Sequence, residues 1–146
     1  MTVLVTGAFG LVGSATVRQI ASEGRRVVAT DLDVPANRKA AAELSGVEVR
    51  YADLTDPAAI ERLVAEVAPT AIVHLAAVIA PFCYGRRALA RKVNVGGTAN
   101  LLAAAAKLPT PPRFVHASSI AVYGPRNPYT VTGVLSADTP ATPGDL

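Results

Sequence analysis

Three glycines near the N-terminus have the spacing of a phosphate-binding turn. Gly7, Gly10 and Gly13 follow the apolar residues 3–6 and precede an amphipathic stretch that begins at Leu11. In such a strand–turn–helix unit the first glycine permits a tight turn, the second lets a pyrophosphate approach the backbone, and the third lets the helix pack closely on the sheet. The N–H groups and dipole of the helix start favour an anion. The pattern predicts a dinucleotide site, with a purely structural turn as the alternative.

Acidic residues stand where two later apolar runs end. Asp31 closes the run 26–31, about twenty residues after the glycine turn, where a carboxylate can accept hydrogen bonds from an adenosine ribose and repel a 2′-phosphate. This position predicts NAD rather than NADP, with a turn aspartate as the alternative, although Arg38 lies near enough in sequence to meet a phosphate. Asp53, after the run 47–51, can accept from an adenine amino group or cap the next helix.

Two serines, a histidine and a cysteine complete the side chains with chemical potential. Ser118 and Ser119 follow the run 113–117, where a nicotinamide would project, and are candidates for polarising a substrate oxygen. His74 lies near the end of the apolar run 71–75. It is expected to be a core histidine with its hydrogen bonds satisfied rather than a ligand. The only cysteine, Cys83, excludes an internal disulfide, suits a reducing cytoplasm and is expected to be a small loop or core residue.

The elements that must position these side chains are short runs rich in β-branched residues, alternating with helix-like stretches. The expected strands are Thr2–Thr6, Arg26–Asp31, Val47–Tyr51, Ala71–Leu75 and Arg113–Ala117. The expected helices are Leu11–Glu23, Asn37–Leu44, Pro57–Val67, with Asp56 as its N-cap, and about Arg87–Leu108. This alternation predicts an α/β fold of the Rossmann type, a doubly wound parallel sheet with strand order 3-2-1-4-5.

The end of the chain differs from the rest in composition. Residues 124–146 are rich in Pro, Thr, Gly and Ser and lack sustained periodicity, which predicts a loop. We therefore expect the dinucleotide-binding domain to span residues 1–123. Because a complete doubly wound domain would add another strand after this point, we expect the fold to be incomplete at the C-terminus.

Length, composition and charge bound the class of protein. The chain has 146 residues, of which 51% are hydrophobic and 17% charged, so it can bury a core as one globular domain. Its net charge of +3 comes from scattered arginines and lysines, so no nucleic-acid partner is expected. The longest apolar stretch, Ala71–Phe82, is too short to span a bilayer, so no membrane association is expected. No basic segment precedes the first strand, which argues against a signal peptide and for the cytoplasm.

Taken together, these motifs resemble the extended short-chain dehydrogenase/reductase family, the NAD-dependent sugar epimerases and dehydratases. The matching segments occur in family order over nearly the whole chain: Thr6–Gly13, Asp31, Asp53–Leu54, His74–Ala77, Asn94–Thr98 and Ser118–Gly124. The resemblance implies NAD as the cofactor and a nucleotide sugar or related small molecule as the substrate. It also allows a homodimer through the helix near residues 87–108, with internal packing as the alternative.

The resemblance implies roles for individual residues. An NAD site would be formed by Gly7, Phe9, Gly10, Leu11, Val12, Gly13, Asp31, Asp53, Leu54, Leu75, Ala76, Ala77, Asn94 and Ser118. The glycine turn would hold the pyrophosphate, Asp31 the ribose, and Asp53 with Leu54 would flank the adenine. Ser119 would be the catalytic serine, and Tyr123 would be the structural tyrosine of a Val-Tyr-Gly motif.

One part of the family pattern is missing. The family's catalytic base is a tyrosine, activated by a lysine four positions later that lowers the tyrosine pKa. No lysine follows Lys107, and the tyrosines at 123 and 129 have Asn127 and Gly133 at the lysine position. The favoured interpretation is the NAD-binding portion of an epimerase/dehydratase-type oxidoreductase. The alternative is a non-catalytic dinucleotide-binding module or redox sensor.

Overall fold

The computed structural model describes residues 1–124 and 133–144. The chain divides into two compact units, Met1–His116 and Ala117–Leu146, which we describe separately. The first unit holds five strands and the main helices, and the described part of the second holds the short 3-10 helix η2 (Ile120–Tyr123). Among the described residues, no helix combines the length and the apolar character that crossing a membrane requires.

The first unit is built on a parallel sheet. Its strands are β1 (Thr2–Thr6), β2 (Arg26–Asp31), β3 (Glu48–Tyr51), β4 (Ala71–His74) and β5 (Arg113–His116). They lie in the order β3-β2-β1-β4-β5, which confirms the predicted doubly wound arrangement. Thr6 of β1 pairs with Thr30 of β2 and with His74 of β4, so the carboxyl ends of these strands meet at one end of the sheet.

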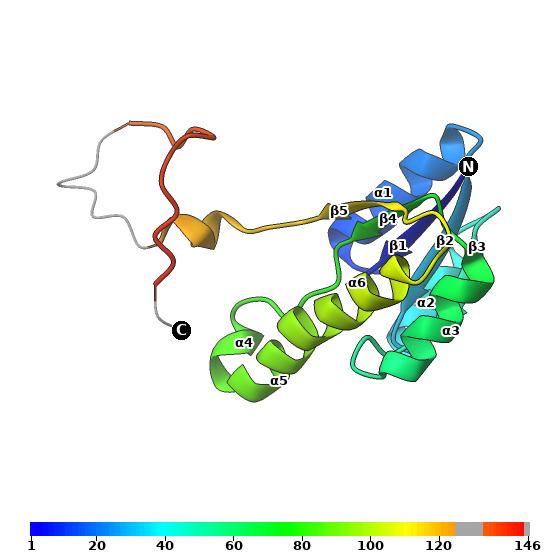
Figure 1. Cartoon of the computed structure of the whole chain (residues 1–146), viewed down its shortest axis with the longest axis horizontal. Coiled ribbons are helices and arrows are strands. Elements are labelled where there is room, and N and C mark those ends of the chain that lie inside the picture. The colour runs from blue at the N-terminus through cyan, green and yellow to red at the C-terminus, as the bar shows by residue number, and fades with distance from the viewer. Residues whose placement is uncertain (125–132, 145–146) are drawn as a thin grey trace. The chain divides into compact units, whose positions relative to one another are not determined.

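Helices cover both faces of this sheet. They are α1 (Leu11–Ser22), α2 (Pro35–Ala42), α3 (Pro57–Val67), α4 (Phe82–Gly85), α5 (Arg87–Arg91), the π-helix η1 (Lys92–Gly97) and α6 (Thr98–Ala106). The paired helices α3 and α6 pack on one face, and α1 covers the other (Figure 1). Because both faces are covered, the successive residues Val3 and Leu4 are both buried, in different clusters.

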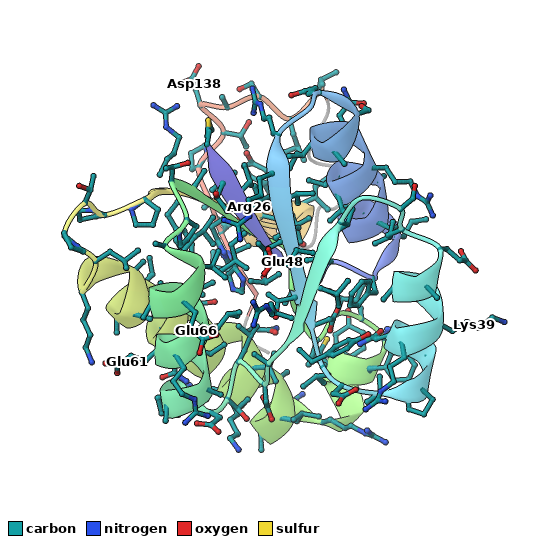
Figure 2. The ribbon with its side chains drawn as sticks, turned by 90° about the vertical axis from the view of Figure 1, so that its right-hand side faces the viewer. Arg26, Lys39, Glu48, Glu61, Glu66 and Asp138 are labelled. Atoms are coloured by element: carbon teal, nitrogen blue, oxygen red, sulfur yellow. The ribbon has the colours of Figure 1, made fainter. Side chains whose placement is uncertain are left out.

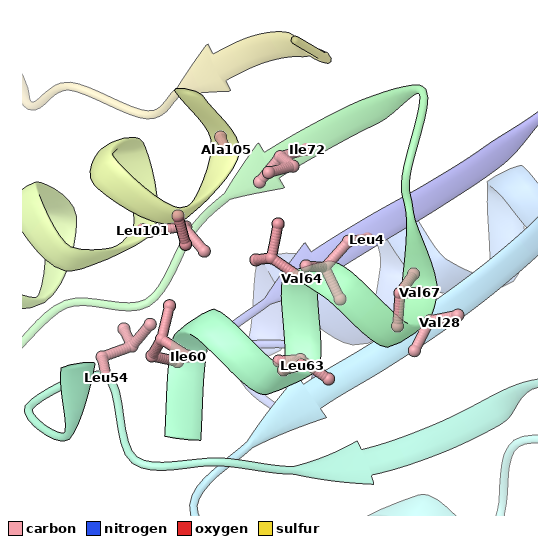
Figure 3. Close-up of a cluster of buried hydrophobic side chains, with 11 residues drawn as sticks. Leu4, Val28, Leu54, Ile60, Leu63, Val64, Val67, Ile72, Leu101 and Ala105 are labelled. Atoms are coloured by element: carbon pink, nitrogen blue, oxygen red, sulfur yellow. The ribbon is translucent and has the colours of Figure 1, made fainter. Parts of the chain in front are cut away.

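Helix α3 shows how the sequence builds one of these faces. As predicted, Asp56 caps it, and its carboxylate accepts hydrogen bonds from the N–H groups of Ala58 at 3.0 Å and Ala59 at 3.1 Å. The apolar residues of α3 recur every three or four positions, so they form one stripe. Figure 3 shows this stripe packed against β1, β2, β4 and α6 through Ile60, Leu63, Val64, Val67, Leu4, Val28, Ile72, Leu101 and Ala105.

The single helix expected over residues 87–108 is instead divided into α5, η1 and α6. The π-helical segment contains Asn94, whose side-chain amide bonds the backbone of Val78, a distant contact that periodicity cannot reveal. The alanine run at 103–106 is split, since Ala104 and Ala105 are buried whereas its two outer residues are exposed. The one-turn helix α4 was not predicted, because so short a segment carries no periodicity.

Candidate functional site

The glycine turn joins the end of β1 to α1 through two close backbone approaches. Gly7 has a φ of 66°, and a Cβ added there would lie 2.7 Å from the backbone nitrogen of Ala76. A Cβ at Gly13 would lie 1.9 Å from the carbonyl oxygen of Gly7. The packing of the turn on the segment after β4, and of α1 on the turn, therefore requires glycine at both positions.

Gly10 is different, because nothing in the protein forbids a side chain there. It is the N-cap of α1 with an ordinary φ of −72°, and an added Cβ would meet only the Gly7 carbonyl oxygen, at 3.5 Å. Within the described residues no side chain caps this helix, and its first turn holds no acidic residue. Leu11 and Val12, which follow, are 91% and 64% exposed. The helix start is therefore open to solvent and suited to an anion.

Asp31 is held against this turn. Its Oδ2 accepts a hydrogen bond from the N–H of Phe9 at 3.4 Å, and its Oδ1 accepts one from the N–H of Leu32 at 2.8 Å. The Phe9 ring also contacts the ring of Tyr51, with centroids 6.1 Å apart, and Tyr51 is the register partner of Asp31 in β3. The carboxyl ends of β2 and β3 thus lie beside the glycine turn. Tyr51 was not among the predicted site residues, although its place at the end of a strand is a usable signal.

The sequence left open whether Arg38 could meet a phosphate. In the structure Arg38 is paired with Asp33. Its Nε donates to Oδ1 at 2.5 Å and its Nη2 donates to Oδ2 at 2.8 Å, a two-point ion pair. The Arg38 hydrogen bonds lower the pKa of the Asp33 carboxyl, and the same contact raises the pKa of Arg38. Of this pair, only Arg38 was a candidate from the sequence.

Asp53 and Leu54 lie in the connection between β3 and α3. Asp53 is exposed, and its Oδ1 accepts from the N–H of Thr55 at 2.8 Å, so it does not cap α3. Leu54 is only 8% exposed, because its side chain packs in the core against Gly97, where an added Cβ would lie 2.8 Å from the Leu54 Cβ. Of the two, Asp53 has the side chain that is presented to solvent.

His74 is a buried, fully bonded histidine of the kind the sequence predicts. Its Nδ1 lies 2.6 Å from Thr6 Oγ1 and its Nε2 lies 2.9 Å from Thr98 Oγ1. Thr98 donates its own proton to the Asn94 carbonyl oxygen at 2.6 Å, so Nε2 must donate to Thr98, and Nδ1 then accepts from Thr6. Burial, and secondarily the charge of nearby His116, lowers the pKa of His74 to about 4. The ring is therefore neutral at pH 7 and structural.

Hydrogen bonds hold the segment after β4 to β1 at one point and to η1 at another. The N–H of Ala76 reaches Thr6 Oγ1 at 3.4 Å, and the N–H of Leu75 donates to the Thr6 carbonyl at 3.2 Å. Further on, the Asn94 amide both accepts from the Val78 N–H at 2.8 Å and donates to the Val78 carbonyl at 3.0 Å. The first unit thus brings the glycine turn, Asp31 and the half-buried residues 75–76 to one end of its sheet, with residue 77 exposed.

The serines Ser118 and Ser119 belong to the second unit and are exposed. Ser119 caps η2, where its Oγ accepts from the N–H of Ala121 at 3.2 Å. Tyr123 donates its hydroxyl to the Ser136 carbonyl at 3.4 Å, a structural contact. These side chains line a hollow of about 450 Å³ within this unit. Asn127 and Tyr129, two of the positions compared above with the Tyr-x-x-x-Lys motif of the family, lie outside the described residues.

The sheet order and the glycine turn define a Rossmann-fold protein. Over residues 3–143 the chain matches the family described as the NAD dependent epimerase/dehydratase family, and it belongs to this family. This confirms the resemblance inferred from the motifs.

Individual relatives agree with this assignment. UDP-glucose 4-epimerase of Mycoplasma genitalium is 30% identical over 150 residues, which cover 96% of this chain and 42% of that protein. dTDP-glucose 4,6-dehydratase of Neisseria meningitidis serogroup B is 34% identical over 137 residues, covering 84% and 38%. The chain spans less than half the length of the curated relatives it matches.

Solved structures show the same likeness. The NAD complex of UDP-glucose 4-epimerase from Thermus thermophilus superposes with a TM-score of 0.85 at 29% identity, covering 98% of this chain and 45% of that one. The enzyme WbmG of Bordetella bronchiseptica, in complex with NAD and UDP, gives a TM-score of 0.79 at 25% identity, with coverages of 97% and 44%.

Proposed function

We propose that this chain is the NAD-binding portion of an epimerase/dehydratase-type oxidoreductase. The observation that carries the proposal is Gly10. The other two glycines of the turn are required by backbone packing, whereas Gly10 has room for a side chain and an ordinary backbone conformation. At the open start of α1, a glycine leaves the backbone N–H groups accessible to the phosphate of a ligand, which supports the proposal.

The proposed site extends along the carboxyl ends of the strands. The start of α1 would hold the pyrophosphate, Asp31 the adenosine ribose, and Asp53 the adenine amino group. The chain at 75–77 and Asn94 would form the wall next to the nicotinamide half. Bound NAD supplies a ring that accepts or donates a hydride. For Ser118 and Ser119 we retain the roles that the family resemblance implies, cofactor contact for the first and substrate contact for the second.

We propose a nucleotide sugar as the substrate of the whole protein, because UDP-glucose and dTDP-glucose appear in the names of relatives. In the mechanism that the family resemblance implies, the Ser119 hydroxyl donates a hydrogen bond to the reacting hydroxyl oxygen of the substrate. A tyrosine paired with a lysine removes the proton from that substrate hydroxyl. Residues 108–146 contain no lysine, so that pair is not in this chain. The alternative function is a non-catalytic dinucleotide-binding module.

The first prediction tests NAD binding. Gly10→Val should raise the Kd for NADH at least about tenfold, because a branched side chain would cover the helix start where the pyrophosphate is proposed to bind. Fluorescence titration with NADH measures the Kd, and thermal unfolding should show a folded protein. Gly85→Ala, where an added Cβ has nothing within 4 Å, is the control and should bind normally. Unchanged NADH binding by a folded Gly10→Val would contradict the proposal.

A second prediction separates binding from catalysis. The 146-residue chain should bind NADH but not convert UDP-glucose, since it lacks the proton-transferring pair. Ser119→Ala should leave NADH binding unchanged, because its proposed contact is with the substrate. Turnover by this chain that Ser119→Ala abolishes would show that the pair is not needed. A Tyr-x-x-x-Lys motif encoded beyond residue 146 would support the enzyme over the non-catalytic module.

Two further expectations concern assembly and location. A homodimer would use the exposed side of η1 and α6, where Val95 is 61% and Leu102 is 46% exposed. A cytoplasmic location rests on the single cysteine, which suits a reducing compartment.

A further inference from the structure

The ion pair between Asp33 and Arg38 lies at the corner where the proposed site would bind the adenosine ribose. Asp33 stands two residues beyond Asp31, and Arg38 lies on α2, which begins directly afterwards. Arg38 is also close enough to Tyr51 for the tyrosine to add to the rise in its pKa, and Tyr51 is the register partner of Asp31. Asp33 therefore lies two residues from the carboxylate proposed to select the cofactor, and Arg38 is bonded directly to Asp33.

Three cations stand on the two elements that follow Asp31, Arg38 and Lys39 on α2 and Arg50 on β3, and of these Arg38 bonds Asp33. Lys39, the next residue on α2, points away from the sheet into solvent (Figure 2). Arg50, at the end of β3, is engaged by Glu48 at 3.0 Å and Glu66 at 3.6 Å. A guanidinium binds a phosphate through the same two-point geometry that Arg38 uses toward Asp33, so the Nε–Nη2 edge of Arg38 cannot serve both partners at once.

We propose that Asp33 is a specificity-determining residue for the cofactor, which acts by occupying Arg38. The proposal rests on the proposed NAD site. With Asp33 present, two carboxylates and one guanidinium leave this corner with a net negative charge, which disfavours a 2′-phosphate. Without Asp33 the corner is neutral and the Arg38 fork is free. Discrimination against NADP thus has two sources. The Asp31 carboxylate repels the 2′-phosphate, and Asp33 keeps Arg38 from binding it.

The test uses the Kd values of NADH and NADPH in a set of variants of the full chain. Asp31→Ser removes the direct repulsion and serves as the background. Adding Asp33→Asn should tighten NADPH binding at least about tenfold over Asp31→Ser alone, because Arg38 becomes available. Adding Arg38→Ala to that double variant should abolish the gain. Lys39→Ala in its place is the matched control and should leave the gain intact.

Each outcome decides a separate point. Equal NADPH affinity in Asp31→Ser and in the double variant with Asp33→Asn would overturn the role of Asp33. A gain that survives Arg38→Ala would show that Asp33 acts through its own charge and not through Arg38, and would overturn the proposed device. If the wild-type chain does not bind NADH at all, the proposed function fails instead, and the two failures are thereby distinguished.

Discussion

Gly13→Ala should destabilise the first unit by about 3 kcal/mol or more, near the upper end of what overpacking costs. The added Cβ would lie 1.9 Å from the Gly7 carbonyl oxygen and 2.8 Å from the Gly7 carbonyl carbon. Both are backbone atoms of a turn that is itself packed on Ala76, so no flexible side chain can move aside. Relief requires α1 to shift away from the sheet, which opens the cluster around Val17.

Urea unfolding followed by circular dichroism measures this loss. A domain of this size has a total stability of only about 5–15 kcal/mol, so the unfolding midpoint should fall sharply. Gly96→Ala is the matched control, because it makes the same substitution in a helical segment where an added Cβ has nothing within 4 Å. It should stay within about 1 kcal/mol of the wild type. A Gly13→Ala midpoint equal to that of the wild type would refute the packing argument.

The stability of the chain should also fall by about 1.5 kcal/mol between pH 6.5 and pH 5, because the folded and unfolded chains bind protons differently at His74. His74 has a pKa of about 4 in the folded chain, against 6.5 for a free histidine. Between these values the unfolded chain holds a proton on this ring that the folded chain does not, so lowering the pH favours unfolding. The contribution of neutral His74 is complete above pH 6.5 and is lost as the pH falls toward 4, for a total of about 3 kcal/mol.

Urea unfolding at several pH values tests this dependence, and the window above pH 5 keeps carboxylate titration small. Below it, Asp33 and Glu48 contribute as well, because arginine hydrogen bonds lower the pKa of each and that stabilisation disappears on protonation. His74→Gln should be less stable at pH 7 but nearly insensitive to pH from 6.5 to 5. His116→Gln changes the only other histidine and should keep most of the dependence. A wild-type stability that does not change over this window would contradict the assignment of a neutral buried ring.

The sheet and the glycine turn could be predicted because their determinants are local. Apolar runs mark strands buried on both faces, and the bounds of Thr2–Thr6 and Arg26–Asp31 agree with the structure. Asp56 followed by proline marks the start of α3 for the same reason, since a cap acts within one turn. Asp31 could be singled out because it ends a strand at the carboxyl end of the sheet.

What could not be predicted depends on how side chains meet in the folded chain. The packing of Leu54 against Gly97 joins segments that are distant in sequence, so the place of Leu54 in a loop does not reveal it. The π-helical segment carries Asn94, whose bonds to Val78 join residues sixteen positions apart in sequence. The spacing of Asp33 and Arg38 does not reveal their ion pair, because one lies before α2 and the other within it, and their contact depends on how the chain enters that helix.

The His74 bonds have a consequence for how the strands find their alignment. Residues 3–5 of β1 and 71–73 of β4 are all apolar, and both faces of the sheet are covered, so sliding one strand past the other by a residue would bring similar side chains together. Such a slip would separate Thr6 from His74 and leave buried polar atoms without partners. The hydrogen-bonded chain Thr6–His74–Thr98 therefore fixes the register of β1 against β4. It selects one alignment where the hydrophobic pattern tolerates several.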